Sequence, residues 1–214
     1  ERQVDRPALT AAGILGGMFY FVRFGFGFLN PGRVDWLLGM ADTAFNQLSW
    51  TFYRGDAWHW PPSAVRTFMA PGGTTVGLTD SLPLLAVPLK LISPLLPDPF
   101  QYAGIWLLVS HVLMAVFALK VAALLFRPLV ARVLAAGVLV LCPAWLIRDG
   151  HFALSAHWVY LAALSLSLGP AAAAGDRPWL RWWLLLAITA LIHPYPATIC
   201  LLLLGADQGR RLFV

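Results

Sequence analysis

Residues 102–126, YAGIWLLVSHVLMAVFALKVAALLF, contain a single charged side chain, Lys120. A helix needs about 20 predominantly apolar residues to cross the hydrocarbon core of a bilayer, so this stretch predicts a membrane-spanning helix. The composition agrees: 59% of the 214 residues are hydrophobic and 12% are charged, with a mean hydropathy of +0.72. Soluble domains contain about 45–50% apolar and about 25% charged residues. The sequence therefore predicts an all-α, polytopic membrane protein.

Three further apolar runs lie around this stretch. The first contains Arg23 and no small-x-small cleavage pattern follows it, so we expect a span rather than a cleaved signal. An alanine-rich turn, AAAAG at 171–175, follows the last run. The predicted spans are 8–29, 102–126, 131–147 and 151–169, within one membrane domain that covers residues 1–214.

The net charge of +5 does not indicate a nucleic-acid partner, because the basic residues flank apolar spans and are explained by membrane topology. Cys142 and Cys200 both lie in apolar runs, which favours small core residues over a disulfide or a metal-binding pair. No glycine-rich nucleotide loop is present, so the sequence gives no support for a nucleotide cofactor, and we expect none.

The apolar run 182–204 is interrupted by the motif His193-Pro194-Tyr195-Pro196. Proline lacks an amide donor and disfavours helix at the preceding residue. Two arrangements are open: a single kinked span, or a broken helical hairpin with the motif at its apex. With the N-terminus in the cytoplasm, only the hairpin returns Arg210 and Arg211 to the side where basic residues gather, so it is our prediction.

This topology leaves residues 30–100 as one large loop on the outer face. Between 34 and 53, residues recur at helical spacing and separate into an apolar and a polar side. The apolar side contains Leu37, Ala41, Phe45, Leu48 and Phe52, and the polar side contains Asp35, Asp42, Asn46, Ser49 and Tyr53. We predict an interfacial amphipathic helix whose Asp42 faces away from lipid.

The rest of this loop is rich in tryptophan and proline. Trp50, Trp58 and Trp60 are predicted at the headgroup level, where amphipathic rings prefer to lie. Residues 81–96 are apolar but interrupted by three prolines, which predicts a broken, partly embedded helix.

Four motifs carry a resemblance to a known class of protein. They are DWLLGMADTAFNQLSWTFYR (35–54), TDSLPLLAVPLKLISPLLPDPFQY (79–102), RDGHFALSAHW (148–158) and LIHPYP (191–196). Together they resemble the N-terminal part of GT-C glycosyltransferases, and more closely a bacterial GT-C-like family of unknown function. The resemblance implies a multi-pass protein of the bacterial inner membrane that uses a polyprenyl-phosphate-linked sugar. It also implies a module or fragment, because the known enzymes are longer.

In that class, an aspartate of the first outer loop lies beside the reacting sugar, and Asp42 matches its position. A carboxylate at the membrane–water boundary can act as a general base. The alternative is a solvated face of an interfacial helix with no chemistry. Asp56 is a weaker second carboxylate, because the sequence around it also favours a turn.

The second candidate cluster is RDGHFALSAHW. Arg148 and His151 are predicted to bind phosphate, and His157, about one and a half turns into the fourth span, to face the protein interior. The alternative is an ordinary loop in which Asp149 offsets Arg148. The spacing of the two histidines does not place them on one helix face, so no metal site is expected.

The remaining candidates are His193 and Tyr195, for sugar hydroxyls, and Arg54, as a second phosphate ligand. If the hairpin forms, His193 and Tyr195 lie on the same membrane face as Asp42; the alternative is a purely structural kink. Arg23, His111 and Lys120 lie within spans, where they snorkel, pair or line a cavity.

Two classes of function fit these patterns. The first is an inverting sugar transferase whose partners are the bilayer and a lipid-linked sugar donor. The second is a non-catalytic membrane subunit packed against proteins of a larger complex. A transporter has less support, because no predicted span carries the repeated ionisable residues of a relay.

Overall fold

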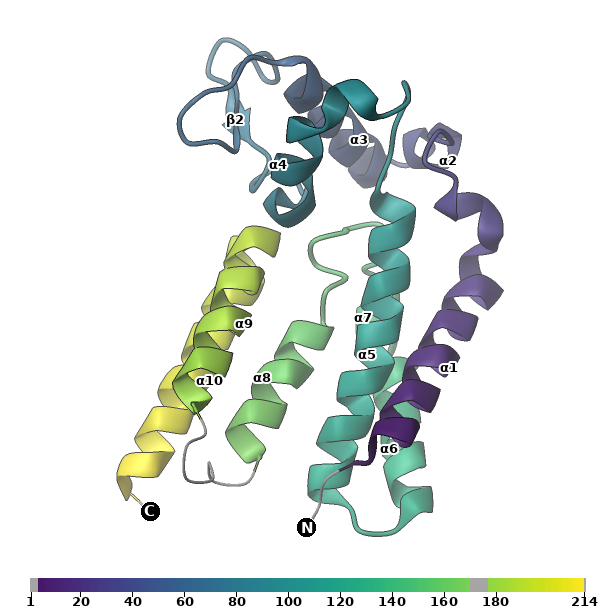
Figure 1. The fold of residues 1–214 in the computed structure, drawn as a ribbon, viewed down its shortest axis with the longest axis vertical. Coiled ribbons are helices and arrows are strands. Elements are labelled where there is room, and N and C mark those ends of the chain that lie inside the picture. The colour runs from purple at the N-terminus through teal and green to yellow at the C-terminus, as the bar shows by residue number, and fades with distance from the viewer. Residues whose placement is uncertain (1–3, 170–176, 214) are drawn as a thin grey trace.

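The structure is a computed structural model that describes residues 4–169 and 177–213. It is mostly helical, with 68% helix and 2% strand. A bundle of long helices carries at one end a smaller unit formed by residues 30–100, which we call the cap (Figure 1). The alanine-rich turn predicted at 171–175 lies outside the described residues.

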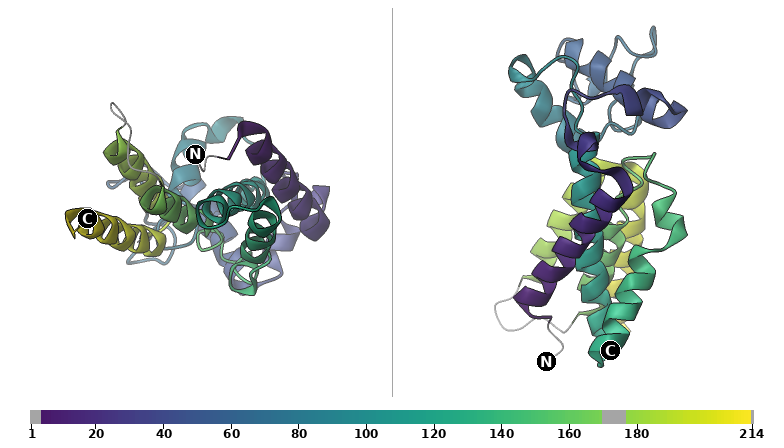
Figure 2. Two further views of the ribbon diagram at one scale, coloured as in Figure 1. Left: turned by 90° about the horizontal axis from the view of Figure 1, so that it is seen from below. Right: turned by 90° about the vertical axis from the view of Figure 1, so that its right-hand side faces the viewer.

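Helix α5, Ala103–Leu125, is the centre of the bundle. Helices α1 (Arg6–Phe24), α6 (Leu129–Val140) and α8 (Trp158–Leu168) each pack against it. Helices α9 (Pro178–Ile192) and α10 (Pro194–Phe213) pack on each other and on α8. Helix α1 begins and α10 ends at the end of the bundle opposite the cap (Figures 1 and 2).

Three segments of the described chain are long and apolar enough to cross a membrane: Arg6–Phe24, Ala103–Leu125 and Leu129–Leu146. They agree with three of the predicted spans and indicate a membrane protein. The first ends five residues before its predicted boundary, because Gly25 takes a φ of 72°, and a short 3-10 helix, η1 (Phe26–Leu29), follows. The third is interrupted between α6 and α7 (Pro143–Leu146).

The predicted span 151–169 is wrong in its first half, because α8 begins only at Trp158. Backbone carbonyl groups of the turn before α8 accept hydrogen bonds from side chains of other elements. The Phe152 carbonyl accepts from Trp106 Nε1 at 2.6 Å, and the Ser155 carbonyl accepts from Trp145 Nε1 at 2.8 Å. These long-range bonds replace helical ones. The predicted break in 182–204 is present, since α9 ends at Ile192 and His193 takes an extended conformation.

The cap contains α2 (Asp35–Leu38), α3 (Ala41–Gly55), α4 (Pro83–Leu91) and a 3-10 turn, η2 (Ser93–Leu95). Strands β1 (Ala64–Val65) and β2 (Thr74–Thr75) pair antiparallel, a small exception to the predicted all-α fold. The proline-rich segment 81–96 therefore forms two short helical pieces. Trp50 is 1% exposed and lies in the core, whereas Trp60 is 86% exposed.

Helix α3 has its polar side turned inward. Ser49 hydrogen-bonds Thr79, and Asn46 donates to the Asp80 carbonyl, both inside the cap. Phe45, Leu48 and Phe52 are about 40% exposed on the outward side (39%, 45% and 42%). Leu37 departs from the predicted apolar stripe, because it is fully buried on α2. At about 1.5 Å per residue, α3 is too short to cross a hydrocarbon core of about 30 Å.

Candidate functional site

Asp42 and His151 are in direct contact. The Asp42 Oδ2 atom lies 3.1 Å from His151 Nε2, and the two side chains are 60% and 36% exposed. Asp42 lies in the first turn of α3, and His151 lies in the turn that follows α7. A residue of the cap and a residue 109 positions later in the bundle thus form one solvent-accessible acid–base pair. Sequence reasoning selected Asp42 and His151 as separate candidates, and the structure brings the two side chains together.

Asp80 links the helix that contains Asp42 to the turn that contains His151. It was not singled out from the sequence. Its Oδ1 atom accepts a hydrogen bond from the Ala153 N–H at 2.8 Å, two residues after His151. Its carbonyl accepts from Asn46, one helical turn after Asp42. The detectable signal is the polar triplet Thr79-Asp80-Ser81, separated by one residue from a helix that begins with proline. Thr79 and Ser81 are almost completely buried, so the triplet belongs to the interior of the cap.

The Asp80 carboxyl is held largely away from water. Its Oδ2 atom is buried and has no hydrogen-bond partner among the described residues. Burial raises the pKa of Asp80 to about 7; the backbone N–H groups of Ala153 and Phe152 act in the opposite direction, and the charge of Asp42 raises it further. Near neutral pH, Asp80 therefore exchanges its proton beside an Asp42 carboxylate.

The Asp80→Asn substitution should make the protein less sensitive to pH. The folded state binds the Asp80 proton more tightly than the unfolded chain, so wild-type stability falls as pH rises from 3.8 to about 7. Asparagine keeps the acceptor for Ala153 and does not ionise. At pH 8 the variant should be more stable by up to about 4 kcal/mol, at about 1.4 kcal/mol per pKa unit. Melting temperatures in detergent at pH 4 and pH 8 measure this, and an equal gain at both values would contradict it.

Asp149 pairs with α1 rather than with its neighbour. Its Oδ2 atom accepts from Arg23 Nη2 at 2.6 Å, so the alternative in which Asp149 offsets Arg148 is wrong. Burial raises the pKa of Asp149 to about 6, while Arg23 acts to lower it. The Arg148 side chain is exposed and has no ion-pair partner in the described part of the chain. Its guanidinium is available to an anion, one turn of backbone from His151.

His157 lies at the residue before α8, not inside a helix as predicted, and its ring contacts Tyr160 at 5.3 Å. His193 and Tyr195 lie at the junction of α9 and α10, with ring centroids 4.7 Å apart. The Tyr195 N–H donates to His193 Nδ1 at 3.2 Å. Among the described residues, none of these three side chains contacts Asp42 or His151. The junction of α9 and α10 nevertheless lies at the cap end of the bundle, the same end as Asp42 (Figure 1).

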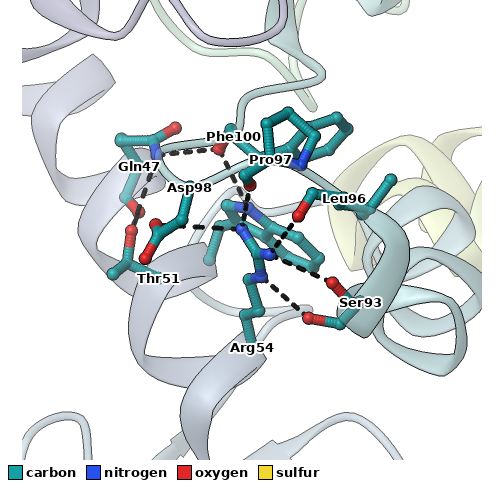
Figure 3. Close-up of polar contacts among 9 residues, drawn as sticks. Gln47, Thr51, Arg54, Ser93, Leu96, Pro97, Asp98 and Phe100 are labelled. Atoms are coloured by element: carbon teal, nitrogen blue, oxygen red, sulfur yellow. Dashed lines mark hydrogen bonds and ion pairs between the residues drawn. The ribbon is translucent and has the colours of Figure 1, made fainter.

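Arg54 has a structural role that uses its whole guanidinium (Figure 3). Nε donates to Ser93 Oγ at 2.7 Å, and Nη2 donates to the Ser93 and Leu96 carbonyls at 3.0 and 2.9 Å. Nη1 donates to the Pro97 carbonyl at 2.6 Å. Arg54 also lies twelve residues after Asp42 on the same helix, about 18 Å along its axis. These contacts argue against the predicted phosphate ligand, and we leave Arg54 out of the proposed site.

The Arg54→Met substitution should destabilise the cap by about 2–4 kcal/mol, because it leaves three backbone carbonyls without their donor. Arg54→Lys should recover only part of this loss, since an ammonium group cannot reproduce the planar fork. Limited proteolysis of residues 93–100 measures the effect. Arg66→Met, at an exposed arginine of the same cap, is the control, and equal cleavage of the two methionine variants would contradict the assignment.

Asp56 also has a structural role. Its Oδ2 atom accepts from the backbone N–H groups of Arg66 and Thr67 at 2.6 and 3.3 Å, and its Oδ1 atom accepts from Ala57 at 2.9 Å. Burial acts to raise its pKa, but these bonds and His59 outweigh it and hold the pKa at about 2. Asp56 therefore organises a turn, which was the alternative reading of its sequence.

The fold and the site define a class: a helical membrane protein whose polar cap meets the end of the bundle at an exposed Asp–His pair. Residues 13–214 match the family model described as Domain of unknown function (DUF6311), and the chain belongs to that family. Comparisons with curated proteins and with solved structures give no match.

Proposed function

We propose that this protein is a GT-C-like membrane glycosyltransferase, or the N-terminal module of one. It transfers a sugar from a polyprenyl-phosphate donor at the outer face of a bacterial inner membrane. The observation that carries the proposal is the 3.1 Å contact between Asp42 and His151. It supplies an accessible base at the end of helices that are long enough to span a bilayer, which is where a lipid-linked substrate presents its headgroup.

In the proposed reaction, Asp42 takes the proton of the acceptor hydroxyl. The acceptor oxygen forms a bond to the anomeric carbon, the bond from that carbon to the phosphate oxygen breaks, and its electron pair leaves with polyprenyl phosphate. The configuration at the anomeric carbon is inverted. His151 holds the Asp42 carboxylate in place through the 3.1 Å contact. The 60% exposure of Asp42 leaves room for an acceptor.

Arg148 is the proposed ligand of the leaving phosphate. It is exposed, it forms no ion pair among the described residues, and it lies on the same turn as His151. A guanidinium matches phosphate with a planar fork of charged donors. His193, Tyr195 and His157 remain candidates for the sugar, at the same end of the bundle.

The alternative function is a non-catalytic subunit of a membrane complex. One observation favours it: none of the residues of α6 is buried, and large apolar side chains such as Val22 (83%) and Val138 (71%) are exposed on α1 and α6. Such faces suit further helices as well as lipid.

Donor binding tests the proposal. Titrating the purified protein with a short-chain polyprenyl phosphate, followed by native mass spectrometry, should show binding that Arg148→Gln weakens about tenfold, the equivalent of about 1.4 kcal/mol. Arg127→Gln, at an exposed arginine between α5 and α6, is the matched control and should leave the Kd unchanged. An unaltered Kd for Arg148→Gln would remove the phosphate ligand from the proposal.

A further inference from the structure

A cavity of about 640 Å³ lies between α1 and α6, at the end of the bundle opposite the cap. Both helices pack against α5 (Figure 2, left), and Ala115 and Leu119 of α5 also line the cavity. Most of its lining side chains are small or aliphatic, for example Ala12, Ala115 and Gly137. Leu15 and Val133, which also line it, are 63% and 56% exposed, so the cavity is a furrow open to the surroundings.

The furrow lies along membrane-spanning helices. It extends on α6 from Leu129 to Val140 and on α1 from Ala8 to Gly16, with Asp5 just before α1. At about 1.5 Å per residue the two helical stretches are about 16 and about 12 Å long. Half of a hydrocarbon core of about 30 Å is about 15 Å. The furrow therefore reaches from one end of the spans to about the middle of the bilayer, which is the depth of one leaflet.

The charged residues of the furrow lie only at its mouth. Asp5 Oδ1 already accepts from the Ala8 N–H at 3.1 Å as the cap of α1. Arg132 donates through Nε to the Phe126 carbonyl at 2.9 Å. Its two terminal nitrogens have no hydrogen bond or ion pair among the described residues. The mouth thus offers a cationic fork directly above an apolar channel.

We propose that this furrow binds one phospholipid of the adjacent leaflet, with an acyl chain along α1 and α6 and the phosphate at Arg132. Apolar cavities of this kind do not hold water, because water needs several polar partners. The volume lies within the range of about 300–1,000 Å³ that is typical of ligand sites. Free guanidinium donors at the polar end of an apolar channel complement an anionic headgroup with a hydrocarbon chain. The site is separate from the Asp42–His151 pair, which lies at the cap end.

Filling the furrow tests the proposal without knowledge of any activity. A Cβ atom at Gly137 meets nothing within 4 Å, so Gly137→Phe should fold and place its ring in the channel. Native mass spectrometry of the detergent-purified protein, titrated with phosphatidylglycerol, should show binding that is at least about tenfold weaker in this variant. The control is Val138→Phe, at the neighbouring position, which is 71% exposed and does not line the furrow.

The headgroup is tested separately. Arg132→Gln should weaken binding about tenfold, and Arg127→Gln, outside the furrow, should not. Circular dichroism and size-exclusion chromatography check that each variant is folded. Unchanged binding in folded Gly137→Phe would overturn the proposal. A change from dimer to monomer in that variant, without a change in lipid binding, would show instead that a helix of a second copy occupies the furrow.

Discussion

Replacing Asp42 by asparagine should abolish sugar transfer, with a loss of about 10³-fold in kcat, while the fold is retained. General-base catalysis contributes about 10²–10⁴-fold, and asparagine preserves the shape of the side chain but cannot accept the acceptor proton. Asp42 is 60% exposed, so its removal leaves no buried charge unpaired. Complementation of a deletion strain, with the accumulated polyprenyl-phosphate sugars measured by mass spectrometry, gives the readout.

Two further variants make this result specific. Asp35→Asn changes another exposed carboxylate of the cap, which pairs with Arg33 at 3.0 Å, and should leave transfer unchanged. His151→Gln should lower kcat less than Asp42→Asn does, because the base itself remains. If Asp42→Asn complements as well as the wild type does, the catalytic proposal fails and the non-catalytic subunit is the better description.

Replacing Gly104 by alanine should destabilise the protein strongly, with a loss of more than about 3 kcal/mol. Its added Cβ would overlap the Phe28 carbonyl oxygen and lie 2.7 Å from the carbonyl carbon. Both atoms are main chain, so no side-chain rotation relieves the clash. Melting temperature and aggregation in detergent measure the loss.

The region around Gly104 explains why this loss matters for the site. Gln101 donates through Nε2 to the carbonyls of Phe28 and Asn30 at 2.9 and 2.8 Å, and its Oε1 accepts from the Gly104 N–H at 2.9 Å. These bonds join the chain where it enters the cap to the chain where it leaves. Separating the segment around Phe28 from the segment around Gly104 should therefore also disturb the placement of Asp42.

Gly137→Ala is the matched control for Gly104→Ala. It also adds one methyl group to a glycine in a helix of the bundle, but its Cβ meets nothing within 4 Å. Alanine should be neutral or should stabilise the helix by up to about 1 kcal/mol. Equal melting temperatures for the two variants would show that α5 does not approach Phe28 as closely as described.

The sequence alone determined those features that depend on neighbours along the chain. Apolar length identified the segments Arg6–Phe24, Ala103–Leu125 and Leu129–Leu146, because burying a run of about 20 residues in lipid needs no distant partner. The prolines after His193 set the break between α9 and α10, because a missing amide donor is a local property.

Only the tertiary structure decided what distant groups do to one another. The turn around Phe152 is kept in a non-helical conformation by hydrogen bonds to Trp106 of α5 and Asp80 of the cap. Asp149 finds Arg23, 126 residues away, instead of its neighbour Arg148. The guanidinium of Arg54 is saturated by carbonyls about 40 positions further on. In each case the side chain could bind several partners of similar chemistry along the sequence. Packing decides which of these groups lie within hydrogen-bond distance and are removed from water, and so decides the partner.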